Sequence, residues 1–138
     1  MIQRIQSIWL LLVAIFAAVT FRFPFYTGER LIDNMATTFD LDARTTIWLS
    51  IITVLTGAVA FVNIFLFDNR KLQLKLCYLG IFLSVLLIVM YFLEISNFSK
   101  GRIALWCLFH FAILGCYILA TRAIWKDEKL IKSMDRLR

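Results

Sequence analysis

The sequence has few of the residues that soluble proteins place on their surface. Only 17% of its 138 residues are charged, whereas 62% are hydrophobic. A typical soluble domain has about 25% charged and roughly 45–50% apolar residues. A chain this short buries only a modest fraction of its surface in a core of its own. A water-soluble fold is therefore excluded, and lipid must cover part of the apolar surface.

Residues that carry chemistry are scarce as well. There is one histidine, and the three cysteines all lie in apolar stretches (Cys77, Cys107 and Cys116). Such cysteines behave as small buried hydrophobic residues and do not indicate a disulfide framework. The acids Asp33, Asp40 and Asp42 lack the spacing and the glycine of an EF-hand loop. The sequence shows no catalytic or nucleotide-binding motif, so we expect no cofactor and no metal, and a non-enzymatic role is favoured.

Four long apolar blocks account for most of the chain. They cover approximately residues 5–21, 47–67, 74–93 and 103–124. Each is close to the roughly 20 residues that a helix needs to cross the hydrocarbon core of a bilayer. Each is apolar on every face, unlike the amphipathic helices of a soluble bundle. The sequence therefore predicts an all-α fold, an integral membrane four-helix bundle that forms a single domain.

The first block has a competing interpretation. Arg4, the apolar run that follows it, and the alanines Ala14, Ala17 and Ala18 resemble a secretory signal peptide. The apolar run is longer than the hydrophobic region of most signal peptides. We therefore expect the block to be retained as the first membrane span.

Lysine and arginine are distributed unevenly between the two sides of the predicted spans. Ten of them lie at the termini or in the link between the second and third blocks, and five lie in the other two loops. The positive-inside rule places the richer side in the cytoplasm. We therefore expect both termini in the cytoplasm and the loop 22–46 outside. The net charge of +6 then reflects the orientation of the chain in the membrane, and we expect no nucleic acid as a partner.

The predicted loop 22–46 is the only sizeable outer element. Asp33 and Asn34 form a turn signal within a stretch that mixes apolar and polar residues. A small hairpin and an unstructured loop both fit this pattern.

His110 and Asn63 are polar residues in the interior of apolar blocks, where burial of a polar group is costly. His110, in the fourth block, has the chemistry of a metal or haem ligand or of a proton relay. Zinc requires three or four ligands and haem usually a second axial one, and no such set is evident. Asn63, in the second block, suits a polar pathway or a hydrogen bond between helices. For both residues we favour the interhelical hydrogen bond.

The segment 125–138 predicts a short amphipathic cytoplasmic helix, which either continues from the fourth span or lies on the membrane. Its apolar residues recur at helical spacing among charged ones, at Leu130, Ile131, Met134 and Leu137. Such a helix suits an interfacial anchor on anionic lipid or a docking helix for a protein partner. Ile2 and Ile5, about one turn apart near the N-terminus, add apolar residues to the same cytoplasmic surface.

The two ends of the chain carry a resemblance to a known family. The opening MIQRIQSIWLLL and the closing DEKLIKSMDRLR resemble a family of small four-span membrane proteins of Bacteroidota, known as domain of unknown function 4293. The resemblance covers the whole chain and is most specific at residues 1–12 and 127–138. It implies a bacterial inner-membrane location, and it implies neither an activity nor functional residues.

These features favour one role over two others. We expect a non-enzymatic accessory or scaffold subunit that packs within a larger complex of the bacterial inner membrane. Its partners would be the lipid bilayer and other integral membrane proteins or further copies of itself. The grounds are the few spans, the lack of a polar cluster within them and the amphipathic tail.

The alternative is a small transporter or ligand-binding protein with a polar site near His110 and Asn63. An enzyme that acts on lipid or quinone has the least support. Such an enzyme would gather several ionisable residues near one interface, and no such group is evident in the sequence.

Overall fold

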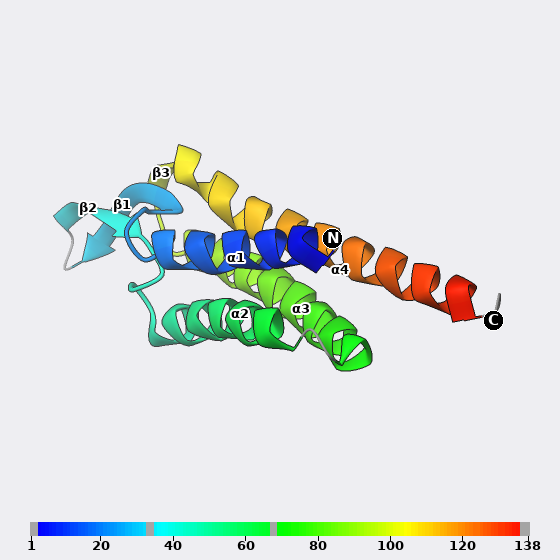
Figure 1. The fold of residues 1–138 in the computed structure, drawn as a ribbon. Coiled ribbons are helices and arrows are strands. Elements are labelled where there is room, and N and C mark those ends of the chain that lie inside the picture. Colours follow the sequence, from blue (N-terminus) through cyan, green and yellow to red (C-terminus); the bar gives the residue numbers. More distant parts are fainter. Residues whose placement is uncertain (1–2, 33–34, 67–68, 136–138) are drawn as a thin grey trace.

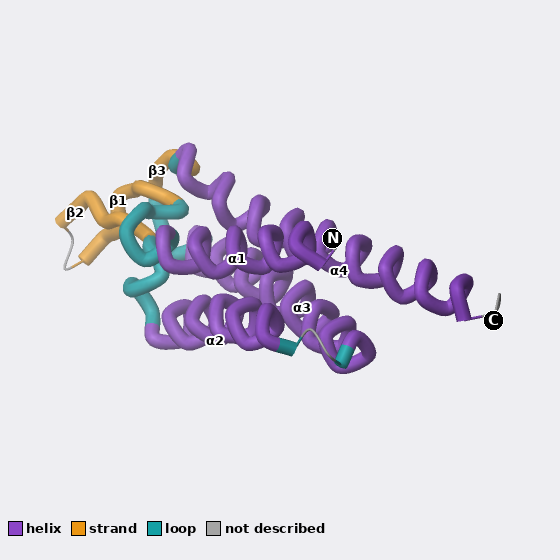
Figure 2. Tube along the Cα trace, viewed as in Figure 1, coloured by secondary structure: helices purple, strands orange, loops and turns teal. Residues whose placement is uncertain are grey.

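The computed structural model describes residues 3–32, 35–66 and 69–135. In this part of the chain four α-helices and three strands are formed (Figures 1 and 2). The helices are α1 (Gln3–Val19), α2 (Ile47–Phe65), α3 (Arg70–Ile95) and α4 (Leu108–Asp135). The strands are β1 (Tyr26–Ile32), β2 (Met35–Leu41) and β3 (Lys100–Ile103), and a short 3-10 helix, η1 (Leu105–Cys107), precedes α4.

The four helices form a bundle that the sheet covers at one end. α1 packs against α2 and α4, and α3 packs against the same two helices. We call the end that carries the strands the sheet end. The opposite end, where α1 begins and α4 projects beyond the other helices, is the tail end (Figure 1).

Large apolar side chains cover the outside of the bundle as well as its interior. Phe61, Phe82 and Val89, for example, are 54%, 62% and 47% exposed. α2, α3 and the helical stretch Leu105–Met134 are each long and apolar enough to cross a membrane, and α1 is apolar but shorter. Because a helix satisfies its own backbone groups, such elements are stable in lipid. The chain therefore has the helices of an integral membrane protein.

Two clusters of buried side chains form the core. The first runs through the bundle and includes Leu10 of α1, Ala60 of α2, Cys77 of α3 and Ile124 of α4. The second lies beneath the sheet, and its buried members are Phe25, Tyr26, Leu41, Leu49, Leu87 and Tyr91. The sheet is thus attached to the helices through a core of its own.

Tyr117 of α4 joins three helices. Its side chain is fully buried, and its hydroxyl donates a hydrogen bond to the backbone carbonyl of Thr56 in α2 at 2.6 Å. Its ring lies against Gly80 of α3, at a position that a β-carbon on residue 80 would overlap. Small residues allow close approach between membrane helices. Gly80 is therefore the residue that makes room for the ring.

The sheet has the strand order β2-β1-β3, with β1 antiparallel to both neighbours. Gly28 lies opposite Gly101, and the ring of Tyr26 lies close to both glycines. A β-carbon added at Gly28 would lie 2.8 Å from this ring, and a β-carbon added at Gly101 would lie 2.6 Å from it. Tyr26 and Leu41 are buried and face the second core cluster. The opposite face is polar and exposed, with a shallow groove of about 420 Å³ lined by residues that include Glu29, Lys100 and Arg102.

The prediction of an all-α fold is correct for the helices and wrong in omitting the sheet. The loop 22–46 contains the hairpin of β1 and β2, although its turn at Asp33 and Asn34 lies outside the described residues. β3 occupies the end of the link between the third and fourth predicted blocks and the first residue of the fourth block. Its pairing with β1 joins segments far apart in the chain, so α4 begins only at Leu108. Residues 125–135 of the predicted amphipathic tail are helical and continue α4 without a break.

Candidate functional site

Buried polar atoms without partners mark the places where this fold departs from ordinary packing. Eight such side-chain atoms occur in the described part of the chain. They belong to Tyr91 and His110 in one region, and to Gln6, Asn63, Arg70, Gln73 and Asp127 on residues nearer the tail end. Buried polar groups in native proteins almost always have a hydrogen-bond partner. The helices therefore hold more buried polar groups than the apolar blocks of the sequence predict.

At the sheet end, His110 contacts two other aromatic rings. We call His110, Tyr91 and Phe25 the ring cluster. The ring centroid of His110 lies 4.5 Å from that of Tyr91 and 5.0 Å from that of Phe25, edge-on in both cases. Phe25 and Tyr91 stack on each other at 4.6 Å. All three side chains are at most 1% exposed.

Three different segments bring these rings together. Tyr91 lies near the end of α3 and His110 near the start of α4, on the faces that carry the buried residues of each helix. Phe25 precedes β1, and its backbone is held on both sides. Its N–H donates to the carbonyl of Leu41 at 2.7 Å, and its own carbonyl accepts from the N–H of Ala104 at 3.0 Å. The sheet thus positions the Phe25 ring against α3 and α4.

The polar atoms of the ring cluster have no partners. Neither Nδ1 nor Nε2 of His110 is hydrogen-bonded, nor is the hydroxyl of Tyr91. A buried unsatisfied donor or acceptor costs about 1–3 kcal/mol. The interhelical hydrogen bond expected for His110 is therefore not formed, because the rings of Phe25 and Tyr91 surround the imidazole. A metal centre is not supported either, since no group of three potential ligands among His, Cys, Asp and Glu occurs in the described residues.

We expect the two buried tyrosines to differ in how loss of the hydroxyl changes the free energy of unfolding. Tyr117→Phe removes the hydrogen bond to Thr56, and we expect it to lower the free energy of unfolding by about 1 kcal/mol. Tyr91→Phe removes a hydroxyl without a partner, so we expect unchanged stability or a gain of up to about 1 kcal/mol. Detergent-solubilised protein unfolded with SDS and followed by circular dichroism gives both values. Equal losses in the two variants would contradict the assignment.

Asn63 makes the interhelical contacts expected of it. Its side-chain amide donates to the carbonyl of Gln73 at 3.3 Å and to Sγ of Cys77 at 3.0 Å. Gln73 in turn donates to the carbonyl of Asn63 at 3.2 Å. This carbonyl lies in the last turn of α2, where carbonyl groups lack helical partners. The pair thus closes the α2–α3 hairpin.

The structure does not bring His110 and Asn63 together. Asn63 is bonded to Cys77 of the first core cluster, whereas His110 packs on Phe25 and Tyr91 of the second. A single polar site that uses both residues is therefore not formed.

Sequence reasoning missed most of the buried polar residues. Gln73 and Asp127 lie just outside the predicted blocks, yet each continues a buried helical face. Gln73 comes four residues before Cys77, and Asp127 comes three residues after Ile124. This spacing is the signal that would have identified them. Nothing comparable points to Phe25, because its place in the ring cluster depends on the sheet.

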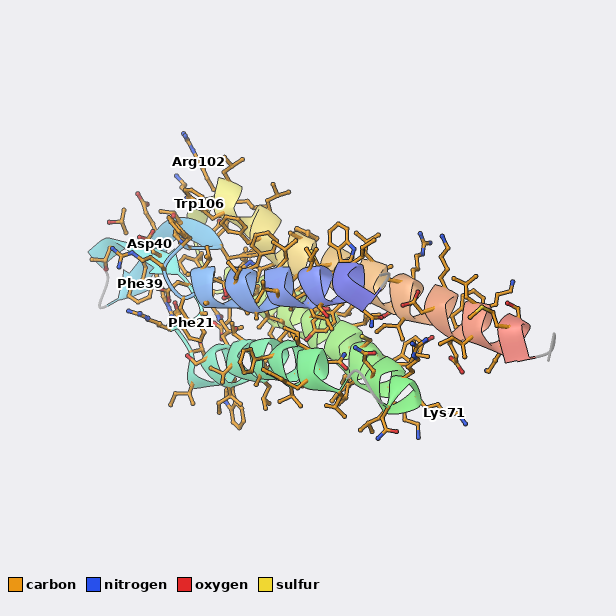
Figure 3. All side chains as sticks on the ribbon, viewed as in Figure 1. Phe21, Phe39, Asp40, Lys71, Arg102 and Trp106 are labelled. Atoms are coloured by element: carbon orange, nitrogen blue, oxygen red, sulfur yellow. The ribbon has the colours of Figure 1, made fainter. Side chains whose placement is uncertain are left out.

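The predicted docking residues lie on two helices. Leu130, Ile131 and Met134 are 43%, 39% and 67% exposed on the projecting part of α4, and we call them the tail surface. Ile5 is exposed on α1, whereas Ile2 and Leu137 lie outside the described residues. Basic residues lie at both ends of the bundle, such as Lys71 at the tail end and Arg102 at the sheet end (Figure 3).

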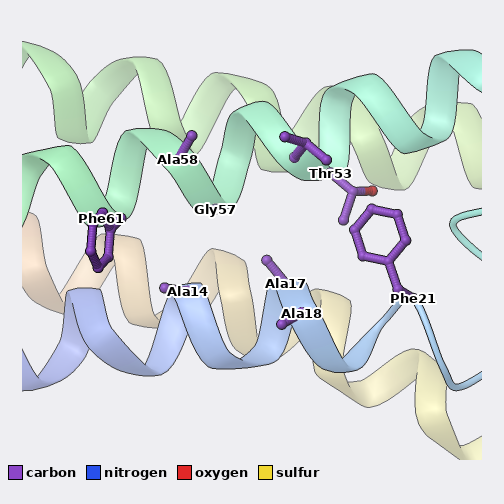
Figure 4. A pocket seen from close by; sticks show the side chains of 9 residues that line it. Ala14, Ala17, Ala18, Phe21, Thr53, Gly57, Ala58 and Phe61 are labelled. Carbon is purple, nitrogen blue, oxygen red and sulfur yellow. The ribbon is translucent and has the colours of Figure 1, made fainter.

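An apolar groove of about 410 Å³ lies between α1 and α2 (Figure 4). Its lining consists mainly of small residues, with Phe21 and Phe61 toward its two ends. A β-carbon on Gly57 would lie 3.2 Å from that of Ala17, so the two helices touch closely there. The groove is almost entirely apolar and offers little for polar chemistry.

Comparison with known proteins agrees with the resemblance seen at the two ends of the chain. No curated protein and no solved structure matches the sequence. One family model matches residues 2–137, which is nearly the whole chain. The chain therefore belongs to the family described as Domain of unknown function (DUF4293).

Proposed function

We propose that this protein is a non-enzymatic accessory subunit of a larger complex in the bacterial inner membrane, and that it docks its partner through the tail surface. The observation that supports this most is the unbroken course of α4 from Leu108 to Asp135. A helix of 28 residues is about 42 Å long, whereas the hydrocarbon core of a bilayer is roughly 30 Å thick. The last turns of α4 then stand out of the bilayer in line with the span.

An upright helix end suits a protein partner better than a lipid surface. An interfacial anchor lies in the plane of the membrane and inserts its apolar face between lipids. The tail surface instead continues the axis of α4 past the other helices (Figure 1). Its apolar side chains are left uncovered by the described part of the chain, and exposed apolar surface of this kind marks interaction sites.

Charge indicates the kind of partner. Lys126, Lys129 and Lys132 are exposed on the same turns of α4, and Lys132 forms a 2.7 Å ion pair with Glu128. An acidic amphipathic segment of a second membrane protein complements both the lysines and the apolar residues. A second copy of the tail surface would bring lysines against lysines, which disfavours self-association through it.

We place the tail end in the cytoplasm and the sheet outside. The reason is the excess of Lys and Arg at the tail end, which the positive-inside rule assigns to the cytoplasm. Green fluorescent protein fused after Arg138 is then expected to fluoresce, and alkaline phosphatase at the same position is expected to be inactive. Phosphatase activity at this fusion point would reverse the assigned orientation.

Purification of a tagged copy in mild detergent tests the docking proposal. We expect a second integral membrane protein at a stoichiometric ratio, cross-linked by a photoreactive residue at position 134. The double variant Leu130→Glu/Met134→Glu should reduce its recovery at least about tenfold, because two buried charges then replace apolar contacts. Both residues are exposed in the chain alone, so its own thermal midpoint should not change.

The matched control adds the same two charges at the opposite end. Thr27→Glu/Thr38→Glu alters exposed residues on the polar face of the sheet and should leave recovery of the partner unchanged. Recovery of the chain alone, or cross-links to lipid or further copies only, would overturn the proposal. So would equal losses in the two double variants.

A further inference from the structure

The outer face of the sheet, opposite the second core cluster, carries two rows of polar side chains. Successive side chains of a strand point to opposite faces, and Tyr26 of β1 points inward. Thr27 and Glu29 therefore point outward, together with the residues that pair with them. Across β2, β1 and β3, the first row is Asp40, Thr27 and Arg102, and the second is Thr38, Glu29 and Lys100. All six residues are exposed.

The charges in these rows are separated by sign. Lys100 and Arg102 both lie on β3, whereas Asp40 lies on β2 and Glu29 on β1; Asp40 and Arg102 mark the two sides of the sheet end in Figure 3. None of the four forms an ion pair within the described part of the chain, so their charges are available to a ligand. Complementarity requires a ligand with a positive group toward β2 and a negative group toward β3. Such a ligand is a zwitterion.

A groove lined by both rows provides the room. Its volume is about 420 Å³, within the range of roughly 300–1,000 Å³ for small-molecule sites. The charged side chains that line it are exposed, so a ligand enters from solvent without any rearrangement. The inner face of the sheet packs on the helices, and the groove therefore faces away from the apolar surface that lipid covers. A water-soluble ligand reaches it more readily than a lipid headgroup.

The spacing of the strands determines the length of the ligand. Neighbouring strands lie about 4.8 Å apart, which places Glu29 about 5 Å and Asp40 about 10 Å from β3. An extended peptide spans about 3.4 Å per residue, so two or three residues bridge these distances and a single amino acid does not. The hydroxyls of Thr27 and Thr38 line the same groove. A hydroxyl both donates and accepts, which suits the N–H and C=O groups of a peptide.

We propose that the groove on the outer face of the sheet binds a short zwitterionic peptide of two or three residues. The amino group of the peptide lies at Glu29 and Asp40, and its carboxylate lies at Lys100 and Arg102. Exposed charge pairs contribute little each, so the affinity is in the millimolar range. Binding is independent of docking through the tail surface, because the groove lies at the other end of the bundle.

Titration of the full-length protein in detergent micelles with trialanine tests the proposal by NMR. The amide of Gly101, which lines the groove, is the reporter. Lys100 is the only lysine followed by glycine in the sequence, so carbonyl-13C lysine combined with 15N glycine selects this one signal. We expect a saturable shift of the Gly101 signal. The amide signals of the glycines within helices should not move; these are Gly57, Gly80 and Gly115.

Two blocked peptides test the two charges separately. N-acetyl trialanine lacks the amino charge and trialanine amide lacks the carboxylate, and each should bind about threefold more weakly, as expected for exposed charge pairs. Lys100→Gln/Arg102→Gln should abolish the difference between trialanine and its amide. Glu29→Gln/Asp40→Asn should abolish the difference between trialanine and the acetylated peptide. All four substitutions alter exposed side chains, so the thermal midpoint should not change.

Lys126→Gln/Lys129→Gln is the matched control. It removes two exposed positive charges at the tail end, so the affinity for trialanine and the differences among the three peptides should equal those of the wild type. Three results would overturn the proposal: no saturable shift at Gly101, equal affinities of the three peptides for the wild type, or an equal loss in the control variant. A shift with alanine as large as with trialanine would refute the assigned length.

Discussion

Gly80→Ala is expected to lower the free energy of unfolding by about 3 kcal/mol, at the upper end of the usual cost of overpacking. The added β-carbon overlaps the ring of Tyr117. That ring has no free direction in which to move, because it is fully buried and its hydroxyl is tied to Thr56. α3 and α4 must therefore separate, or the hydrogen bond to α2 must break. Unfolding in SDS, followed by circular dichroism, measures the loss.

Gly115→Ala provides the control for this substitution. Gly115 also lies within a helix, and no described atom beyond its chain neighbours and its own helix backbone lies within 4 Å of the β-carbon that alanine would add. Alanine is favoured over glycine in a helix by up to about 1 kcal/mol, so we expect a small gain in stability. The same chemical change thus has opposite signs at the two positions. Wild-type stability in Gly80→Ala would show that Tyr117 does not pack on α3 as described.

Gly28→Ala is expected to separate β3 from β1 and to cost about 2–3 kcal/mol. The added β-carbon would lie 2.7 Å from the backbone carbonyl oxygen of Lys100 and 2.8 Å from the ring of Tyr26. The side chain of Tyr26 is able to turn, but the backbone of Lys100 is part of the sheet and is not. Hydrogen exchange should therefore accelerate at Ser99, whose N–H donates to Glu29 across these strands.

The effect should extend to the ring cluster. The N–H of Ala104, just after β3, donates to the carbonyl of Phe25, so displacement of β3 loosens the segment that positions the Phe25 ring. Thr27→Ala is the control, since Thr27 is adjacent to Gly28 and exposed on the other face; it should stay within about 0.5 kcal/mol of wild type. Unchanged exchange at Ser99 in Gly28→Ala would refute the close contact of the two glycine backbones.

The helices were predictable because their signal is local. Long apolar blocks indicate helices in lipid wherever they occur, and the structure places a helix in each of the four. The sheet was not predictable in the same way. Its strands have mixed composition, and β3 is a four-residue element whose partner, β1, lies far earlier in the chain. A short strand of this kind is stable only after the helices have brought the two segments together.

The residues of the candidate site were likewise predictable only where their signal is local. Asn63 was recognised from its place in an apolar block, and its interhelical hydrogen bonds are present. Phe25 and Tyr91 were not recognised, because an aromatic residue near the end of an apolar block is typical of any membrane interface. Nor does the sequence indicate that His110 lacks a partner, since an interhelical hydrogen bond was the expected solution.

By itself, the sequence determined that the chain belongs in a membrane, that it is mainly helical and that it is a member of its family. These properties follow from composition, apolar runs and terminal motifs, which need no knowledge of contacts. Only the tertiary structure decided which buried polar groups are satisfied. Tyr91 and Tyr117 are the same residue type in similar apolar surroundings, yet only Tyr117 has a partner. That partner is a backbone carbonyl on another helix, so it exists only after the helices have packed.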